Sequence, residues 1–305
     1  MQGGEILGYT RILVANSAED SLTLKDLKEK TLIETILLPL EENKKLGPYE
    51  IVIGGERLVY IVNSYDDSIM KFDLLNLTIL DLIKVGRYPI CIKIFRDKIY
   101  VVNCDSNSIS VIDEKTFSLI EDISVGEKPT DIQIDKQNLK IFISNGNSYS
   151  ISVLDLNSEI ISSITLDKQP IKMLIDNERL FVLSYINNGV INYSNISEIG
   201  MEDYNIIMSI DLKGIFTNFI KLKDKEEFYM SNAEDGYLYR VSVGDEVNIS
   251  KIYLSGMPGN IISDGENKLY ITNTSNNDVS IVDIQSNMLI NKIRVGKEPY
   301  GILLL

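Results

Sequence analysis

The chain repeats its own sequence. IYVVNCDSNSISVID at 99–113 and LYITNTSNNDVSIVD at 269–283 share Tyr, Asn, Asn, Ser and Asp at matching positions. Shorter copies recur along the chain as LVANS, YIVNS, YVVNC, FISNG, FVLSY, YMSNA and YITNT. Six of the seven prolines fall at one repeat position, at Pro48, Pro89, Pro129, Pro170, Pro258 and Pro299. Internal repetition of this kind indicates that one structural unit is built several times.

Each unit contains four short segments of alternating polarity bounded by turn residues, a pattern typical of β-strands. In the third unit these segments are PICIKIF, KIYVVN, SISVID and SLIEDISV. Seven units in 305 residues give about 43 residues each, the length of a four-stranded propeller blade. A single small sheet cannot cover its own faces, whereas seven in a ring cover one another. The sequence predicts an all-β, seven-bladed propeller over 1–305 as a single domain.

The two ends of the sequence complement each other. PYGILLL at 299–305 reads as an innermost strand without partners after it, and RILVANS, SLTLKDL and TLIETILLP read as three strands without an innermost one. We expect them to form one composite blade, which closes the ring and removes its open edge.

Four recurring residue types are expected to serve the framework. The Asn column (Asn16, Asn63, Asn103, Asn145, Asn232 and Asn273, with Ser184 in the fifth unit) and the Asp column (Asp26, Asp73, Asp113, Asp155 and Asp283) should bond nearby backbone and hold turns. Pro can begin an innermost strand, because the first position needs no ladder donor. An aromatic column should pack between blades, at Tyr60, Tyr100, Phe142, Phe181, Tyr229 and Tyr270.

These motifs resemble the YVTN family of β-propeller repeats, with its Tyr-Val-Thr-Asn-like strand, Val-Ser-Val-Ile-Asp-like strand and Val-Gly-x-x-Pro turn. The resemblance covers nearly the whole chain and is strongest at 98–129 and 268–301. It implies a propeller fold. Roles in that family range over surface-layer components, binding proteins and modules near redox enzymes, and seven-bladed lactonases share parts of the pattern.

Composition narrows the classes of partner. With 44 acidic and 30 basic residues the net charge is −14, so a nucleic acid would be repelled and is not expected as a partner. No signal peptide or membrane-spanning stretch is visible, which favours a cytoplasmic protein, expected to be a monomer. A cell surface or coat location would require export by a non-classical route or a mature form. Two cysteines, Cys91 and Cys104, are too few for a disulfide framework and are expected to be separate thiols.

Candidate binding residues lie where the blades differ from one another. The starts of the innermost strands should rim the central channel with Tyr49, Glu50, Cys91, Asp131, Lys172, Asn218, Asn260 and Tyr300. Turns between second and third strands should place an acidic ring on the top face, including Asp66, Asp67, Asp105, Glu234 and Asp235. The channel set suits a small polar ligand, and the acidic ring suits a basic protein partner.

The fifth unit, at about 170–214, is the most divergent, with Ser184 in the Asn column and no Pro at its exit. Its extra length is expected between the third and outermost strands, around 194–204, on the bottom face. Drift in a tolerant loop explains this length, and a partner-binding role is the alternative.

The residue inventory limits the chemistry. The chain has no His, which removes imidazole bases, catalytic triads and most zinc or copper sites. No cofactor is expected; calcium is permitted by the oxygen ligands, but no site for it is predicted. Our first hypothesis is a non-catalytic binding or scaffold protein. The alternatives are a lactonase-like hydrolase using Glu50 and Asp131, and a structural component of a cell surface or coat.

Overall fold

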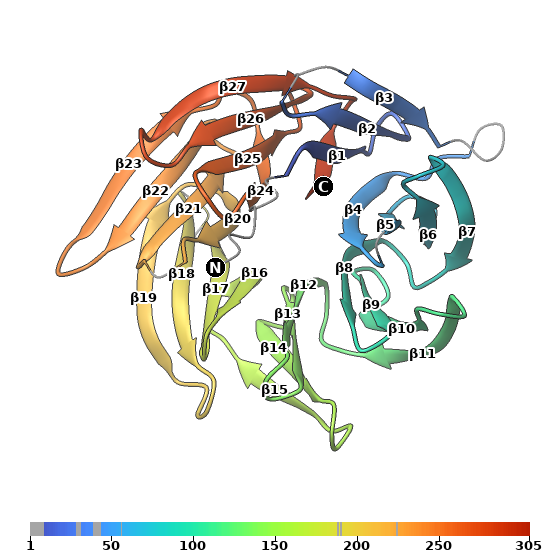
Figure 1. Cartoon of the computed structure of the whole chain (residues 1–305). Coiled ribbons are helices and arrows are strands. Elements are labelled where there is room, and N and C mark those ends of the chain that lie inside the picture. Colours follow the sequence, from blue (N-terminus) through green and yellow to red (C-terminus); the bar gives the residue numbers. More distant parts are fainter. Residues whose placement is uncertain are drawn as a thin grey trace, which may run out of the picture.

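The computed structural model describes residues 9–28, 32–38, 44–55, 57–187, 189, 191–223 and 225–305. Every regular element in these ranges is a β-strand, and 28 strands form seven antiparallel four-stranded sheets arranged around a ring (Figure 1). The prediction of a seven-bladed β-propeller is confirmed. In the part of the chain described, there is no helical segment with the length and hydrophobicity needed to cross a bilayer.

Each blade runs from an innermost to an outermost strand, and the composite blade is counted as blade 1. Blade 1 contains β28 (Pro299–Leu304), β1 (Arg11–Asn16), β2 (Ser21–Asp26) and β3 (Leu32–Leu37), and blade 2 contains β4 (Pro48–Ile53), β5 (Leu58–Asn63), β6 (Ser68–Asp73) and β7 (Thr78–Lys84). Blade 3 contains β8 (Pro89–Phe95), β9 (Lys98–Asn103), β10 (Ser108–Asp113) and β11 (Ser118–Ser124), blade 4 contains β12 (Pro129–Asp135), β13 (Lys140–Asn145), β14 (Ser150–Asp155) and β15 (Ile161–Thr165), and blade 5 contains β16 (Gln169–Asp176), β17 (Arg179–Asn187), β18 (Asn192–Gly200) and β19 (Ile206–Lys213). Blade 6 contains β20 (Phe216–Lys221), β21 (Glu227–Asn232), β22 (Tyr237–Val243) and β23 (Val247–Tyr253), and blade 7 contains β24 (Pro258–Ser263), β25 (Lys268–Asn273), β26 (Asp278–Asp283) and β27 (Met288–Arg294).

The ring closes as the sequence predicts. Strand β28 pairs antiparallel with β1, with Ile12 opposite Leu304 and Val14 opposite Ile302. The Leu305 amide donates to the Arg11 carbonyl at 2.9 Å, which extends the ladder by one residue. Blade 1 is therefore built from both ends of the described chain.

The hydrophobic core is divided into seven clusters, each shared by two neighbouring blades. The predicted aromatic column lies inside them: Tyr60 and Phe142 are fully buried, and each packs against strands of the next blade. Phe181 of blade 5 meets Phe228 of blade 6 edge-on, with ring centroids 5.3 Å apart. Since truncating such a buried ring typically costs about 3–5 kcal/mol, these side chains hold the blades together.

The Asn column joins the second strand to the third strand of a blade. The Asn103 amide donates to the hydroxyls of Ser108 (3.1 Å) and Ser110 (2.8 Å), and Asn16 and Asn145 do the same with their own partners. The prediction of backbone bonding is wrong there, because these buried amides face the hydroxyls of the adjacent strand. It is confirmed at Asn273, whose Oδ1 accepts from the backbone of Met257 and Asn276.

The glycine of the Val-Gly-x-x-Pro turn packs directly on the Asn column. A Cβ on Gly86 would lie 2.6 Å from Cγ of Asn103, and one on Gly126 equally close to Asn145. Neither glycine has a positive φ, so the close approach, rather than conformational freedom, requires glycine here. The two repeat columns are therefore one packing unit.

The Asp column serves the turns after the third strands, as predicted. Asp73 accepts from the Leu75 backbone at 2.8 Å, and Asp113 accepts from the Thr116 backbone at 2.7 Å. These bonds fix the turns that lead into the outermost strands.

The fifth blade corrects one expectation. Residues 194–200 belong to β18, and the loop to β19 is as short as in other blades, with Ile199 opposite Ile206 as Ile112 is opposite Leu119. The extra length lies in the β17–β18 hairpin on the top face, where pairing continues to Asn187 and Asn192. The Tyr185 hydroxyl supports the extension by donating to Asn192 Oδ1 at 2.7 Å.

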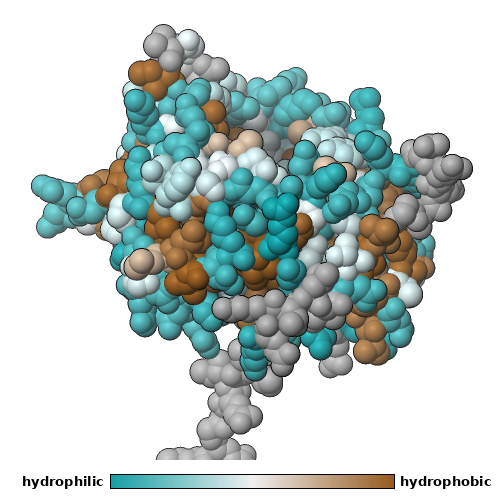
Figure 2. Space-filling view, turned by 90° about the horizontal axis from the view of Figure 1, so that it is seen from above, coloured by the Kyte–Doolittle hydropathy of each residue, from teal (hydrophilic) through white to brown (hydrophobic). Residues whose placement is uncertain are grey.

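The outermost strands expose apolar side chains to solvent. Examples are Leu119 and Ile120 on β11, Ile206 and Ile207 on β19, and Ile290 on β27. Figure 2 shows one side of the molecule, where hydrophobic patches are interrupted by hydrophilic side chains. Charged residues on an edge strand oppose edge-to-edge pairing, and every outermost strand except β15 carries at least one.

Candidate functional site at the channel mouth

Each predicted channel residue lies at or beside a β-bulge in an innermost strand. The register shifts at Pro89/Cys91, Pro129/Asp131, Pro170/Lys172 and Phe216/Asn218, and similar shifts occur beside Tyr49, Asn260 and Tyr300. A bulge bends a strand and redirects a side chain. This local geometry repeats around the ring while the side chains differ, so a common framework presents a variable set of groups to the channel.

Three of these residues form a buried cluster that joins blades 3, 4 and 5. Asp131 is fully buried; its Oδ1 lies 2.9 Å from Lys172 Nζ and accepts from the Cys91 thiol at 3.3 Å. Its Oδ2 accepts from the Met173 backbone at 2.8 Å and from the Gln133 amide at 3.2 Å. Both carboxylate oxygens are thus occupied by the protein itself.

Burial and charge act against each other in this cluster. Burial alone would lower the pKa of Lys172, but Asp131 and Glu50 raise it well above its ordinary value. Burial opposes ionisation of Asp131 too, yet Lys172 and Lys93 lower its pKa. Burial raises the pKa of the Cys91 thiol well above its usual range, aided by Glu50 and Asp131. The cluster is an ion pair with a protonated thiol donor, and Cys91 and Cys104 are separate thiols as expected.

The remaining predicted channel residues meet in pairs. Asn218 Nδ2 donates to Asn260 Oδ1 at 2.8 Å, and the Tyr49 and Tyr300 rings stack with centroids 3.8 Å apart and an interplanar angle of 18°. Glu50 is half-buried beside them, and its charge acts on both tyrosines and on Lys172. The predicted channel residues therefore make contact as one cluster of three and two pairs.

Two adjoining cavities open above the stacked tyrosines at the top mouth of the channel. The larger, about 440 Å³, lies over blades 6, 7, 1 and 2, and its lining includes Thr217, Met257 and Pro258. The smaller, about 200 Å³, is lined by Tyr65, Tyr88 and Ser17 among others. Both share Tyr49, Thr274, Glu298 and Tyr300 as lining residues. A concave site with aromatic walls and a few polar groups is the usual setting for a small ligand.

Sequence reasoning missed Tyr65, Tyr88, Met257 and Glu298. Tyr88, Met257 and Glu298 occupy one repeat position, the residue immediately before the recurring proline of the interblade turns. The repeat pattern assigns that turn only a framework role. The available signal was its variability, since the same position holds Gly47, Tyr88, Lys128, Gln169, Met257 and Glu298 in turn.

The backbone makes this position unusual. Tyr88, Lys128 and Glu298 all have φ of 51°, and Gly47 has φ of 62°. Left-handed backbone favours glycine, so side chains here carry a conformational cost. Tyr88 and Glu298 nevertheless line the channel mouth, where a ligand would contact them.

Two members of the predicted acidic ring on the top face form ion pairs with lysines of the same chain. Asp66 contacts Lys84 (2.9 Å) and Lys44 (3.4 Å), and Asp105 contacts Lys128 (2.5 Å). Burial opposes ionisation of Asp66, but the bonds from Lys84 and Ser68 lower its pKa overall.

The other members of the ring also have partners. Asp67 accepts from the Tyr88 backbone at 2.8 Å, Asp235 accepts from the Tyr239 hydroxyl at 2.6 Å, and Glu234 accepts from Asn192 at 3.4 Å. These carboxylates secure turns and neighbouring strands, and Asp235 also lies 3.8 Å from Lys251.

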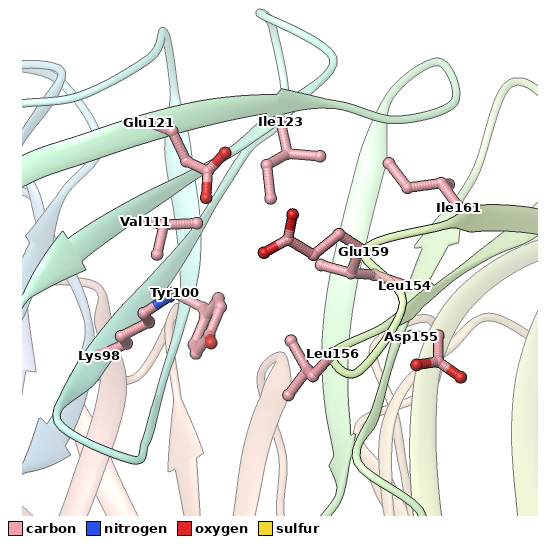
Figure 3. Close-up of a pocket in the computed structure, with 10 residues that line it drawn as sticks. All are labelled: Lys98, Tyr100, Val111, Glu121, Ile123, Leu154, Asp155, Leu156, Glu159 and Ile161. Carbon is pink, nitrogen blue, oxygen red and sulfur yellow. The ribbon is translucent and has the colours of Figure 1, made fainter.

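A third cavity lies between blades 3 and 4 on the bottom side. It measures about 220 Å³, and Glu121 of β11 and Glu159 of the β14–β15 turn approach it beside Tyr100 (Figure 3). Burial and then Glu121 raise the pKa of Tyr100. Both glutamates are exposed, so this cavity is a solvated groove between splayed outer strands.

The fold and this mouth define the class of protein, a seven-bladed β-propeller with a polar, tyrosine-rich channel entrance. No protein-family model matches the chain, and no curated protein matches it in sequence. Similar solved structures are a Bacteroides fragilis protein whose assignment as a 6-phosphogluconolactonase is provisional (14% identity, TM-score 0.78, all of both chains) and a Lactobacillus plantarum protein (14%, 0.78, 97% of this chain and 99% of that one). Hydrazine synthase of Kuenenia stuttgartiensis is also similar (16%, 0.77, 86% and 91%). At these identities the likeness shows the fold.

Proposed function

We propose that this protein binds a small polar ligand at the top mouth of its central channel. The observation that carries the proposal is the pair of adjoining cavities that share the stacked Tyr49 and Tyr300. Loops and strand ends held by a rigid scaffold are where propellers and other closed folds carry binding residues. Here the innermost strands supply the floor and the interblade turns supply the rim.

The geometry supports binding better than hydrolysis. A general base needs a carboxylate oxygen within reach of the substrate, and both oxygens of Asp131 are enclosed and bonded. Cys91 is buried with a raised pKa, so it is not a thiolate nucleophile. Among the described residues, no group of three or more cysteine, aspartate or glutamate side chains is placed to hold a metal ion. Glu50 alone does not supply the paired groups that the lactonase alternative invoked.

A basic protein docking on the acidic ring is the less supported form of the binding hypothesis. Lysines of the same face already contact Asp66 and Asp105, and a partner would have to displace them. Exposed ion pairs contribute little, so the exchange would gain little. The mouth cavities, in contrast, need no such rearrangement.

A ligand screen tests the proposal. Thermal unfolding would be followed in the presence of a library of small polar metabolites, for the wild type and for Ala233→Trp, which fills the larger cavity. Ala18→Trp is the matched control, because Ala18 is exposed on the same face and lines neither cavity. A ligand at a hundredfold excess over Kd stabilises by about 2.7 kcal/mol, a shift of several degrees.

We expect at least one compound to stabilise the wild type and Ala18→Trp but not Ala233→Trp. If no compound stabilises the wild type, or if Ala233→Trp responds equally, the proposed function is wrong.

A further inference from the structure

Four tyrosine rings converge on the smaller mouth cavity. Tyr49 and Tyr300 stack on the channel side, and Tyr65 and Tyr88 complete the lining from the top-face turns. Tyr65 lies against Gly47, where a Cβ would meet its ring at 2.5 Å, so the glycine lets the ring approach. Tyr65 and Tyr88 remain 52% and 39% exposed, which leaves ring surface available to a ligand.

The charges around this cavity are one-sided. Glu298 is the only carboxylate among the described lining residues of both mouth cavities, and those linings contain no Lys or Arg. Glu50 lies half-buried beneath, close enough for its charge to act on both stacked tyrosines. The charges of Lys172 and Lys128 also act on Tyr300 and Tyr88, but each lysine is paired with a carboxylate, Asp131 at 2.9 Å and Asp105 at 2.5 Å. The mouth is therefore electronegative, as is the whole chain at −14.

Resting on the function proposed above, we propose that the ligand of this mouth is a small organic cation carrying an alkylated ammonium group. Aromatic faces attract cations through their negative ring quadrupole, and several rings around one pocket suit a quaternary ammonium. Glu298 supplies the counter-charge at the rim. Met257 and Pro258 of the adjoining cavity offer apolar surface to the alkyl part of the molecule.

Other ligand classes fit less well. An anion would meet Glu298 and Glu50 without a lining cation to receive it. A bare divalent ion prefers several oxygen ligands, and the described residues provide no such cluster. A neutral apolar molecule would bury the tyrosine faces but gain nothing from the two carboxylates.

Calorimetric titration with choline chloride and with 3,3-dimethylbutan-1-ol tests the proposal, because the alcohol replaces the quaternary nitrogen of choline by carbon at nearly equal shape. We expect choline to bind at least tenfold more tightly and to weaken as ionic strength rises. Equal affinities, or no choline binding at millimolar concentration, would overturn the inference.

Failure of the choline prediction would leave the proposed function separately testable. A neutral or anionic compound that stabilises the wild type but not Ala233→Trp would sustain a ligand site at the mouth and reject only its preference for cations. An empty screen would reject both.

Substitutions locate the site. Tyr88→Phe keeps the ring and should retain choline binding, whereas Tyr88→Leu should weaken it about fivefold, the loss expected for one cation–π contact. Glu298→Gln should weaken choline and leave the alcohol unaffected. Tyr149→Leu is the matched control, since Tyr149 is a turn tyrosine on the same face, 47% exposed, that lines neither cavity. Equal effects of Tyr149→Leu and Tyr88→Leu would exclude this pocket.

Glycine variants separate binding from folding. Tyr88→Gly and Glu298→Gly remove the side chains at a backbone conformation that glycine adopts readily, and Gly47 already occupies the equivalent position. We expect both variants to melt at or above the wild-type temperature while losing choline affinity. Undiminished choline binding by both variants would contradict the assignment.

Discussion

At the scale of single residues, the recurring residues of the repeat pack on one another, whereas residues that differ between blades line the channel. Asn103 is buried against Gly86, which explains why the two columns occur together. Asp131 and Lys172 occupy the same repeat position in neighbouring blades, and they meet because adjacent innermost strands bring their bulges side by side. Its role is to fasten blade 4 to blade 5 beneath the mouth.

Removing one member of the Asp131–Lys172 pair should be more harmful than removing both. Asp131→Asn leaves a mostly buried ammonium without its counter-charge and should cost about 3–5 kcal/mol, whereas Asp131→Asn with Lys172→Met should recover most of that loss. Urea unfolding of the two single variants and the double variant measures the coupling. Additive losses would contradict it.

The pKa shifts set the pH range over which the coupling between Asp131 and Lys172 is present. The lowered pKa of Asp131 means its contribution is present above the unfolded value of about 3.9 and is lost as pH falls through the folded value. The raised pKa of Lys172 means its contribution is complete below about 10.4 and is lost as pH rises through the folded value. The measured coupling should therefore be the same at pH 6 and pH 9.

Sequence reasoning reached some of these residues and missed others for a physical reason. Tyr49, Asp131, Lys172 and Tyr300 could be predicted because position in the strand determines which side chains face the channel. Tyr65, Tyr88 and Glu298 could not, because the direction of a turn side chain depends on backbone torsions that spacing does not reveal. The neutralisation of Asp66 by Lys84 likewise requires the distance between two turns.

At the scale of elements, strands were predictable and their local exceptions were not. The Pro column begins five of the six innermost strands that contain it, and β16 begins one residue earlier, at Gln169. The length of the fifth unit was evident, but its placement depended on pairing. Asn187 and Asn192 extend the top hairpin because β17 and β18 continue their register beyond Ser184.

Strand β28 is the element on which ring closure depends. Deleting 299–305 removes the buried Ile302 and Leu304 and exposes the edge of β1, for a loss on the order of 5 kcal/mol. We expect a lower and broader thermal transition. Adding the peptide PYGILLL should restore the melting temperature in a concentration-dependent way. An unchanged melt after the deletion would show that β28 does not stabilise the ring.

At the scale of the whole molecule, the repeat distributes acid sensitivity around the ring. Bonds from Arg57 and from turn backbone lower the pKa of Asp73 to about 2, and turn bonds at Thr116, Ser158 and Ser286 lower the pKa values of Asp113, Asp155 and Asp283. A lowered folded pKa gives stability that is present above the unfolded value of about 3.9 and lost as pH falls below it. Several blades should thus weaken over the same pH interval.

Urea unfolding between pH 5 and pH 2 measures this effect. The variant with Asn at 113, 155 and 283 keeps an oxygen acceptor for each turn but cannot titrate there, so its stability should fall less steeply below pH 4 than that of the wild type. Parallel curves would show that other carboxylates determine the acid response.

Ring closure also orders the assembly of the molecule in time. Ile12 pairs with Leu304, a contact between nearly opposite ends of the chain, and such distant contacts slow folding. During synthesis blades 2 to 7 can form in succession, while β1 must wait with an unpaired inner edge until β28 emerges. A nascent chain is therefore exposed to mispairing along the inner edge of β1 until β28 covers that edge.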